Sequence, residues 1–345
     1  MNPRPAMDDS ALDELLGAYA LDACEPADAT AVEEYLRRDA GAADETMRLR
    51  NAAVWIGATE TLRPPDGLRA SVLDEARARR RAARHDEAIE LYEHEIERFD
   101  ALVQTLDVSA LDVRAPNGLR ARDLVAHMAA MESALAAEIG HPTAPDVTVT
   151  DPDERTAIFI ERYHDDPDGA RRMWRESVDA LLHWARTDGG VGSVTIPWFG
   201  VLMPRADVLV ARAFETWIHA DDLRRAQARA LAPPPANSLR RMGELSARVL
   251  QPALVAGGQG RSGSTARLVL TGEGGGSWTV PCSADEIVDL SDEPLLPDVT
   301  VTADVVEWCL MVGERLDARD LRVSIEGDRE LGAAVIAVAP AFATV

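Results

Sequence analysis

Long stretches of residues 85–228 repeat apolar side chains at helical spacing, and this pattern constrains the fold more than any other feature of the chain. Apolar residues that recur every three to four positions form one face of an amphipathic helix. The pattern opens and closes with the following residues: Ile89, Leu91, Ile96, Phe99, Leu102, and later Leu209, Phe214, Trp217 and Ile218. Four or five long helices of this kind predict a helical bundle.

Prolines and glycines divide the rest of the chain into regions. The strongest breaks are Pro26, Pro64, Pro65, the prolines at 233–235 and the glycine-rich stretch 273–276. Short amphipathic helices precede the bundle, whereas a helix and three β-type runs, at 267–272, 277–282 and 298–303, follow it. We therefore predict a multidomain, mainly α protein. Its predicted parts are a small helical domain (1–80), a four-helix bundle (85–232) and an α+β domain (236–345).

Composition excludes several classes of function. All 36 basic residues are arginine, so chemistry that needs a lysine in a phosphate loop or a Schiff base is absent. The net charge of -23 repels phosphate backbones, and the basic run at 77–84 lacks the aromatic residues that stack on bases. We predict no nucleic-acid partner. Three scattered cysteines, and the lack of an apolar stretch of roughly 20 residues, predict a cytoplasmic protein without a membrane segment.

Two segments of the bundle carry residues that could bind a metal. His127 lies in RDLVAHMAAMESAL beside apolar residues at helical spacing, where it is either a hydrogen-bonded core histidine or a ligand. Glu215 and His219 stand four residues apart in FETWIHADDLRRA, on one side of a helix whose apolar neighbours predict burial. Such a pair can hold a metal or form a plain hydrogen bond. If the bundle brings His127 against this helix, the three form a catalytic type of zinc site with an open fourth position.

At these residues the chain resembles the mycothiol-dependent maleylpyruvate isomerases, whose metal-binding domain is a DinB-like four-helix bundle. The segment APNGLRARDLVAHMAAMESAL resembles the part of the family with the first histidine ligand, and FETWIHADDLRRA resembles its later Glu-x-x-x-His helix. The resemblance covers roughly residues 87–340. It implies that His127, Glu215 and His219 bind zinc or another divalent metal, which in turn binds mycothiol. The stretch from Val306 to Val335 is similar to the family's sterol-carrier-like C-terminal domain, which implies a cofactor-binding role for Arg315.

This resemblance implies an enzyme, either an isomerase or a thiol transferase, that acts on an unsaturated or electrophilic small molecule with a small-molecule thiol. Carboxylates on such a substrate need positive charge, which Arg122, Arg212, Arg224, Arg315 and Arg322 could supply if they are not surface ion pairs. A second hypothesis comes from the N-terminal region, which resembles a small anti-sigma domain. The stretch from Tyr35 to Ala43 lacks the histidine and cysteines that bind zinc there. This alternative predicts a soluble transcriptional regulator that binds a sigma factor through residues 1–80 and senses metal or thiol.

Overall fold

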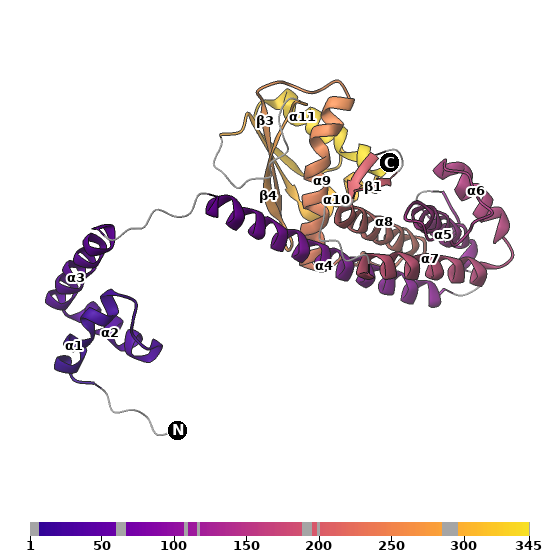
Figure 1. The fold of residues 1–345 in the computed structure, drawn as a ribbon. Coiled ribbons are helices and arrows are strands. Elements are labelled where there is room, and N and C mark those ends of the chain that lie inside the picture. The colour runs from indigo at the N-terminus through magenta and orange to yellow at the C-terminus, as the bar shows by residue number, and fades with distance from the viewer. Residues whose placement is uncertain are drawn as a thin grey trace. The chain divides into compact units, whose positions relative to one another are not determined.

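The computed structural model describes residues 7–59, 67–106, 110–115, 118–187, 195–198, 201–284 and 296–344 (Figure 1). The chain forms two compact units, Met1–Asp74 and Glu75–Val345, with their boundary inside helix α4. The fold is mainly helical with a small C-terminal sheet, as the sequence predicts. The predicted break at Pro64 and Pro65 lies outside the described residues.

The N-terminal unit holds three helices around a core of its own. These helices are α1 (Asp9–Ala20), α2 (Pro26–Arg38) and α3 (Ala40–Thr59). The Asp8 carboxylate accepts a hydrogen bond from the Ala11 amide at the start of α1. The buried residues are Leu12, Leu16, Val32, Tyr35 and Ala42. The short amphipathic helices predicted before the bundle therefore correspond to α1, α2 and α3, which share this core.

Four long helices build the bundle of the second unit, and the first of them begins before Glu75, the start of that unit. They are α4 (Leu68–Gln104), α5 (Ala121–Glu138), α7 (Pro167–Thr187) and α8 (Arg205–Ala226), with the shorter η1 (Ala110–Asp112) and α6 (Pro152–Arg162) between them. The helices share one hydrophobic core, in which the Phe99 and Trp174 rings meet edge to face with centroids 5.1 Å apart. A hairpin of β1 (Thr195–Trp198) and β2 (Val201–Pro204) leads into α8.

Helix α8 is buried around most of its circumference, although it carries several charged residues. Asp207 lies in its first turn, while Arg224 and Arg225 lie in its last, so that these charges oppose the helix dipole. The indole of Trp217 is fully buried in the core. A charged side chain on such a helix needs a partner.

The C-terminal part packs helices on a four-stranded sheet (Figure 1). Strand β3 lies between β4, which is antiparallel to it, and β5, which is parallel, and β6 pairs with β5. The elements are α9 (Ala236–Ala256), β3 (Thr265–Thr271), β4 (Gly276–Pro281), β5 (Val299–Asp304), α10 (Val305–Val312), β6 (Val323–Gly327), α11 (Arg329–Val338) and η2 (Ala339–Thr344). The first three strands overlap the three runs predicted from the sequence. The predicted boundary near residue 235 falls inside the second unit, whose core is continuous, and it stays a prediction.

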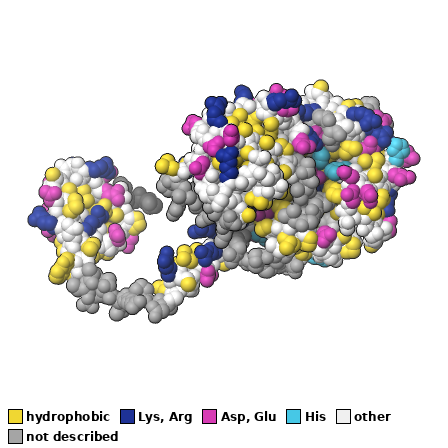
Figure 2. Space-filling model, turned by 90° about the horizontal axis from the view of Figure 1, so that it is seen from above, with side chains coloured by type: hydrophobic (Ala, Val, Ile, Leu, Met, Phe, Trp, Pro, Cys, Tyr) yellow, Lys and Arg dark blue, Asp and Glu magenta, His cyan; other side chains and the backbone are white. Residues whose placement is uncertain are grey.

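Charged side chains of both signs alternate over the larger unit on the face drawn in Figure 2. Arginines pair locally with acidic residues, for example Arg186 with Glu93 and Arg162 with Asp146, each at 2.6 Å. Exposed pairs of this kind contribute about 0–1 kcal/mol each. Within the described ranges, the helices are too short or too polar to cross a membrane.

Candidate metal centre

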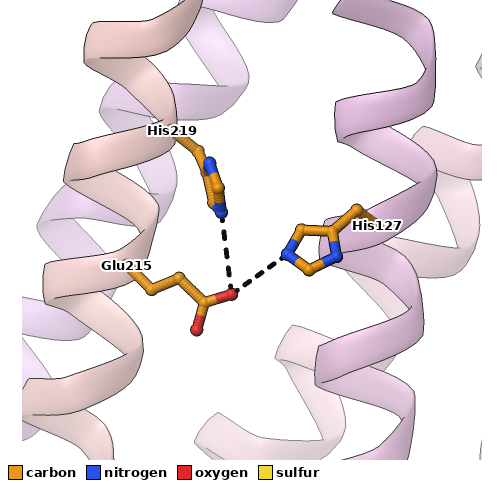
Figure 3. Close-up of side chains that lie close together, drawn as sticks. All are labelled: His127, Glu215 and His219. Atoms are coloured by element: carbon orange, nitrogen blue, oxygen red, sulfur yellow. Dashed lines mark ion pairs between the residues drawn. The ribbon is translucent and has the colours of Figure 1, made fainter. Parts of the chain in front are cut away.

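The three predicted ligands come together between α5 and α8 (Figure 3). Glu215 and His219 project from adjacent turns of α8, and His127 faces them from α5. One ligand atom from each of the three lies within 4.8 Å of the other two. Glu215 and His219 therefore lie on one side of α8, as their spacing in the sequence predicts. The packing of α5 against α8 brings His127 to them.

One carboxylate oxygen is the centre of the cluster. Oε1 of Glu215 lies 3.4 Å from Nε2 of His127 and 3.8 Å from Nε2 of His219. The two imidazole rings meet edge to face, with centroids 5.1 Å apart. Ligand atoms at 2.0–2.2 Å from a tetrahedral zinc are about 3.3–3.6 Å apart, so the separations of 3.4 and 3.8 Å between Glu215 and the histidines suit one such ion, while the three donors, which lie within 4.8 Å of one another, would draw closer around it.

Each histidine turns its other nitrogen toward a hydrogen-bond partner. Nδ1 of His127 lies 2.9 Å from the Thr156 hydroxyl on α6. Nδ1 of His219 lies 3.0 Å from Oδ2 of Asp222, which is fully buried. Partners of this kind orient metal-binding histidines and leave Nε2 for the ion.

The second oxygen of Glu215 is held by Arg212. The guanidinium of Arg212 donates to Oε2 of Glu215 through Nη1, and it donates to Oε1 of Glu132 through Nε at 3.1 Å and Nη2 at 3.0 Å. Both Arg212 and Glu132 are fully buried. The Tyr92 hydroxyl lies beside Glu132 in this buried cluster, where burial and the charge of the carboxylate raise the pKa of the hydroxyl.

The local electrostatics favour the protonation states that a metal needs. Burial would raise the pKa of the Glu215 carboxyl, but the charge of Arg212 and the hydrogen bond from His127 lower it below its usual value. Burial and the neighbouring His127 lower the pKa of His219, against the opposing effect of Asp222. An ionised carboxylate beside a neutral imidazole is the form in which these groups bind metal.

The other predicted residues lie in different places. The Arg315 guanidinium contacts Asp222 rather than a ligand: Nε reaches Oδ1 at 2.8 Å and Nη2 reaches Oδ2 at 2.6 Å. Arg212 is buried in the core and is not a surface residue. Arg122 pairs with Asp112 at 2.8 Å. Arg322 pairs with Glu307 and is exposed.

Four residues at this site have functions that the sequence analysis did not assign. Asp222 stands three residues after His219, a spacing that could have shown the contact. Arg212 stands three residues before Glu215, although we considered it for substrate binding alone. Glu132 and Thr156 join the site across long separations in the sequence, where no local pattern shows the contact.

A bundle with ligands on facing helices is a common framework for a metal centre. Residues 92–224 match the family model described as "Mycothiol maleylpyruvate isomerase N-terminal domain". This match confirms the predicted resemblance for the segment that contains His127, Glu215 and His219.

Solved structures include two of the mycothiol-dependent maleylpyruvate isomerase. One is 21% identical with a TM-score of 0.47, and the other, a histidine-to-alanine mutant, is 19% identical with the same score. Each similarity covers 70% of this chain and 92% of the other. A comparison with curated proteins finds no match.

Proposed function

We propose that this chain is a metal- and mycothiol-dependent isomerase whose centre is held by His127, Glu215 and His219. The convergence of these three donors within 4.8 Å, inside the segment that matches the isomerase family model, carries the proposal. The substrate class is a small unsaturated acid of the maleylpyruvate type. The relatives' activity motivates this assignment.

The residues present fit a divalent cation, with zinc as the first candidate. Two imidazoles and one carboxylate are ligands that zinc prefers, and three protein donors leave a position for an exogenous ligand. When bound, such a cation lowers the pKa of a coordinated thiol, and mycothiol supplies the nucleophilic sulfur.

The chain's own residues keep the donors in place. Arg212 engages Oε2 of Glu215, which leaves Oε1 facing the two histidines. An ionised Asp222 can only accept hydrogen bonds, so His219 carries its proton on Nδ1 and presents the lone pair of Nε2. This arrangement serves isomerisation and thiol transfer equally, and the family match favours isomerisation.

The test is an activity assay with the purified, zinc-loaded protein, mycothiol and maleylpyruvate. We expect isomerisation that needs both the thiol and the metal, and that Glu215→Gln abolishes. Glu176→Gln on the exposed side of α7 is the matched control and should keep full activity. Turnover without mycothiol, or equal turnover by both variants, would contradict the proposal. Turnover of electrophiles alone would favour a thiol transferase.

A sigma-factor-binding regulator is the second candidate. Exposed apolar side chains near the end of α3 favour it, because Val54, Trp55 and Ile56 are 70%, 75% and 63% exposed. The family match lies outside Met1–Asp74 and does not bear on this prediction. Binding of the full chain to an extracytoplasmic-function sigma factor, weakened by Trp55→Ala, would support it. Undetectable binding at micromolar concentration would reject it.

A further inference from the structure

We propose that Asp222 and Arg315 form a positioning relay, through which the C-terminal part of the chain holds His219 in the orientation and tautomer that a metal requires. This inference rests on the proposed function for its metal, but the relay also has a consequence in the metal-free protein. Neither residue contacts the ligand position itself, so both act through His219.

The first step of the relay is the hydrogen bond between His219 and Asp222. Asp222 is fully buried. Both of its carboxylate oxygens accept hydrogen bonds from the Arg315 guanidinium, and Oδ2 also accepts one from Nδ1 of His219. The paired guanidinium favours the ionised carboxylate, which has no proton to donate. The proton of the His219 ring is therefore fixed on Nδ1, and Nε2 stays available at 3.8 Å from Glu215.

The second step is the turn that carries Arg315. Helix α10 ends at Val312, and Glu314 then adopts a φ of 59°, in the left-handed region that a non-glycine residue rarely occupies. Nη1 of Arg315 donates to the Gly313 carbonyl at 2.7 Å, which closes the turn around the guanidinium. Arg315 is therefore held by its own turn before it reaches Asp222.

Close packing fixes this turn against α8. A Cβ atom on Gly313 would lie 2.6 Å from Cδ1 of Ile218, the residue just before His219, so a larger residue at this position would require the Ile218 side chain to move. Strained backbone positions cluster at functional sites, and close packing around a metal-binding side chain holds that side chain in place. The C-terminal part thus contacts the bundle at Ile218, directly beside the predicted metal ligand His219.

The two histidines have unequal support. His127 has the Thr156 hydroxyl, which can donate or accept and so fixes no tautomer, whereas His219 has a charged pair. The proposal therefore predicts that loss of the charged support matters more than loss of the hydroxyl.

Metal affinity of the full chain is the first measurement, made by competition of zinc with a chromogenic chelator. We expect Asp222→Asn and Arg315→Met to weaken zinc binding about 10- to 100-fold. Asp221→Asn is the matched control, because Asp221 is buried on the same helix but pairs with Arg225 at 2.6 Å instead. This control should leave the affinity unchanged, and Thr156→Val should weaken it less than either relay variant does, because a hydroxyl that can donate or accept fixes no tautomer.

The second measurement separates failure of the relay from failure of the proposed function. Nitrogen-15 spectra of the metal-free protein report which nitrogen of His219 is protonated. We expect the Nδ1–H tautomer in the wild type and its partial loss in Asp222→Asn, whose amide NH₂ can face the ring. Arg315→Met, which removes the positive charge that favours the ionised Asp222 carboxylate, serves if Asp222→Asn does not fold.

If the wild type binds no zinc but Asp222→Asn still changes the tautomer of His219, the proposed function is overturned and the relay is kept. Unchanged tautomer and affinity in both relay variants would overturn the relay. Equal weakening by Asp221→Asn would also overturn it, since the effect would then come from general damage to α8.

Discussion

Replacement of Arg212 by methionine tests whether the buried carboxylate of Glu132 and the neighbouring Glu215 depend on this one cation for their stability in the folded chain. In the wild type, this guanidinium donates twice to Glu132 and once to Glu215. The variant leaves two carboxylates near each other without that positive charge. Because Arg212 and Glu132 are both 0% exposed, solvent screening does not reduce the effect.

The magnitude follows from the buried pair. Removal of one partner of a buried ion pair costs about 3–5 kcal/mol, because the other charge stays buried. Coulomb's law with an effective dielectric constant of about 20 gives about 5.5 kcal/mol for two charges at the 3.0 Å separation of Arg212 and Glu132, slightly above that range. We expect Arg212→Met to lower the free energy of unfolding by about 3–5 kcal/mol.

Urea unfolding of the metal-free chain, followed by circular dichroism, measures this loss. The double variant Arg212→Met with Glu132→Leu removes the unpaired buried charge as well, so it should be more stable than the single variant. A single variant within about 1 kcal/mol of the wild type would refute the reasoning. A double variant less stable than the single one would refute it too.

Other predictions concern residues away from the site. Trp174→Ala should cost about 3–5 kcal/mol in unfolding experiments because the ring is fully buried, whereas Trp55→Ala, 75% exposed, should stay within about 0.5 kcal/mol. Burial raises the pKa of the Cys309 thiol, so it should stay protonated and unreactive to a thiol reagent at about pH 8 in the folded chain, while the half-buried Cys24 reacts first; equal rates would contradict this. Burial also raises the pKa of Glu95, although the charge of Arg98 opposes it, so the stability cost of ionising this carboxyl is relieved as pH falls through its folded pKa. Relative to Glu95→Gln, the wild type should therefore gain stability in urea unfolding as pH falls from neutral toward the ordinary pKa of a glutamate, and a loss would contradict the assignment.

Local periodicity made much of the fold and half of the site predictable. The apolar positions of α8 indicated a buried helix, and the four-residue spacing of Glu215 and His219 placed both on one side of it. Strand β3 overlaps the β-type run predicted at 267–272, and its residues alternate between buried and partly exposed positions. These features depend on neighbours in the sequence, which a single chain shows directly.

The support of the site was not predictable, because it depends on long-range packing. Thr156 reaches His127 from another helix, and Glu132 reaches Arg212 from across the bundle. Arg315 was linked to the site by resemblance, but its contact with Asp222 depends on a turn held by Gly313 against α8. Composition and residue spacing do not predict such contacts, because they join residues that are far apart in the sequence.

Metal content of the purified chain tests the central claim most directly. We expect about one zinc per chain in the wild type by mass spectrometry, since the three donors form one site. His219→Ala should abolish metal retention, whereas His183→Ala, which removes an exposed histidine of α7, should leave it unchanged. Equal metal content in the two variants, or a wild type that retains no metal, would contradict the assignment of His127, Glu215 and His219 as a metal centre.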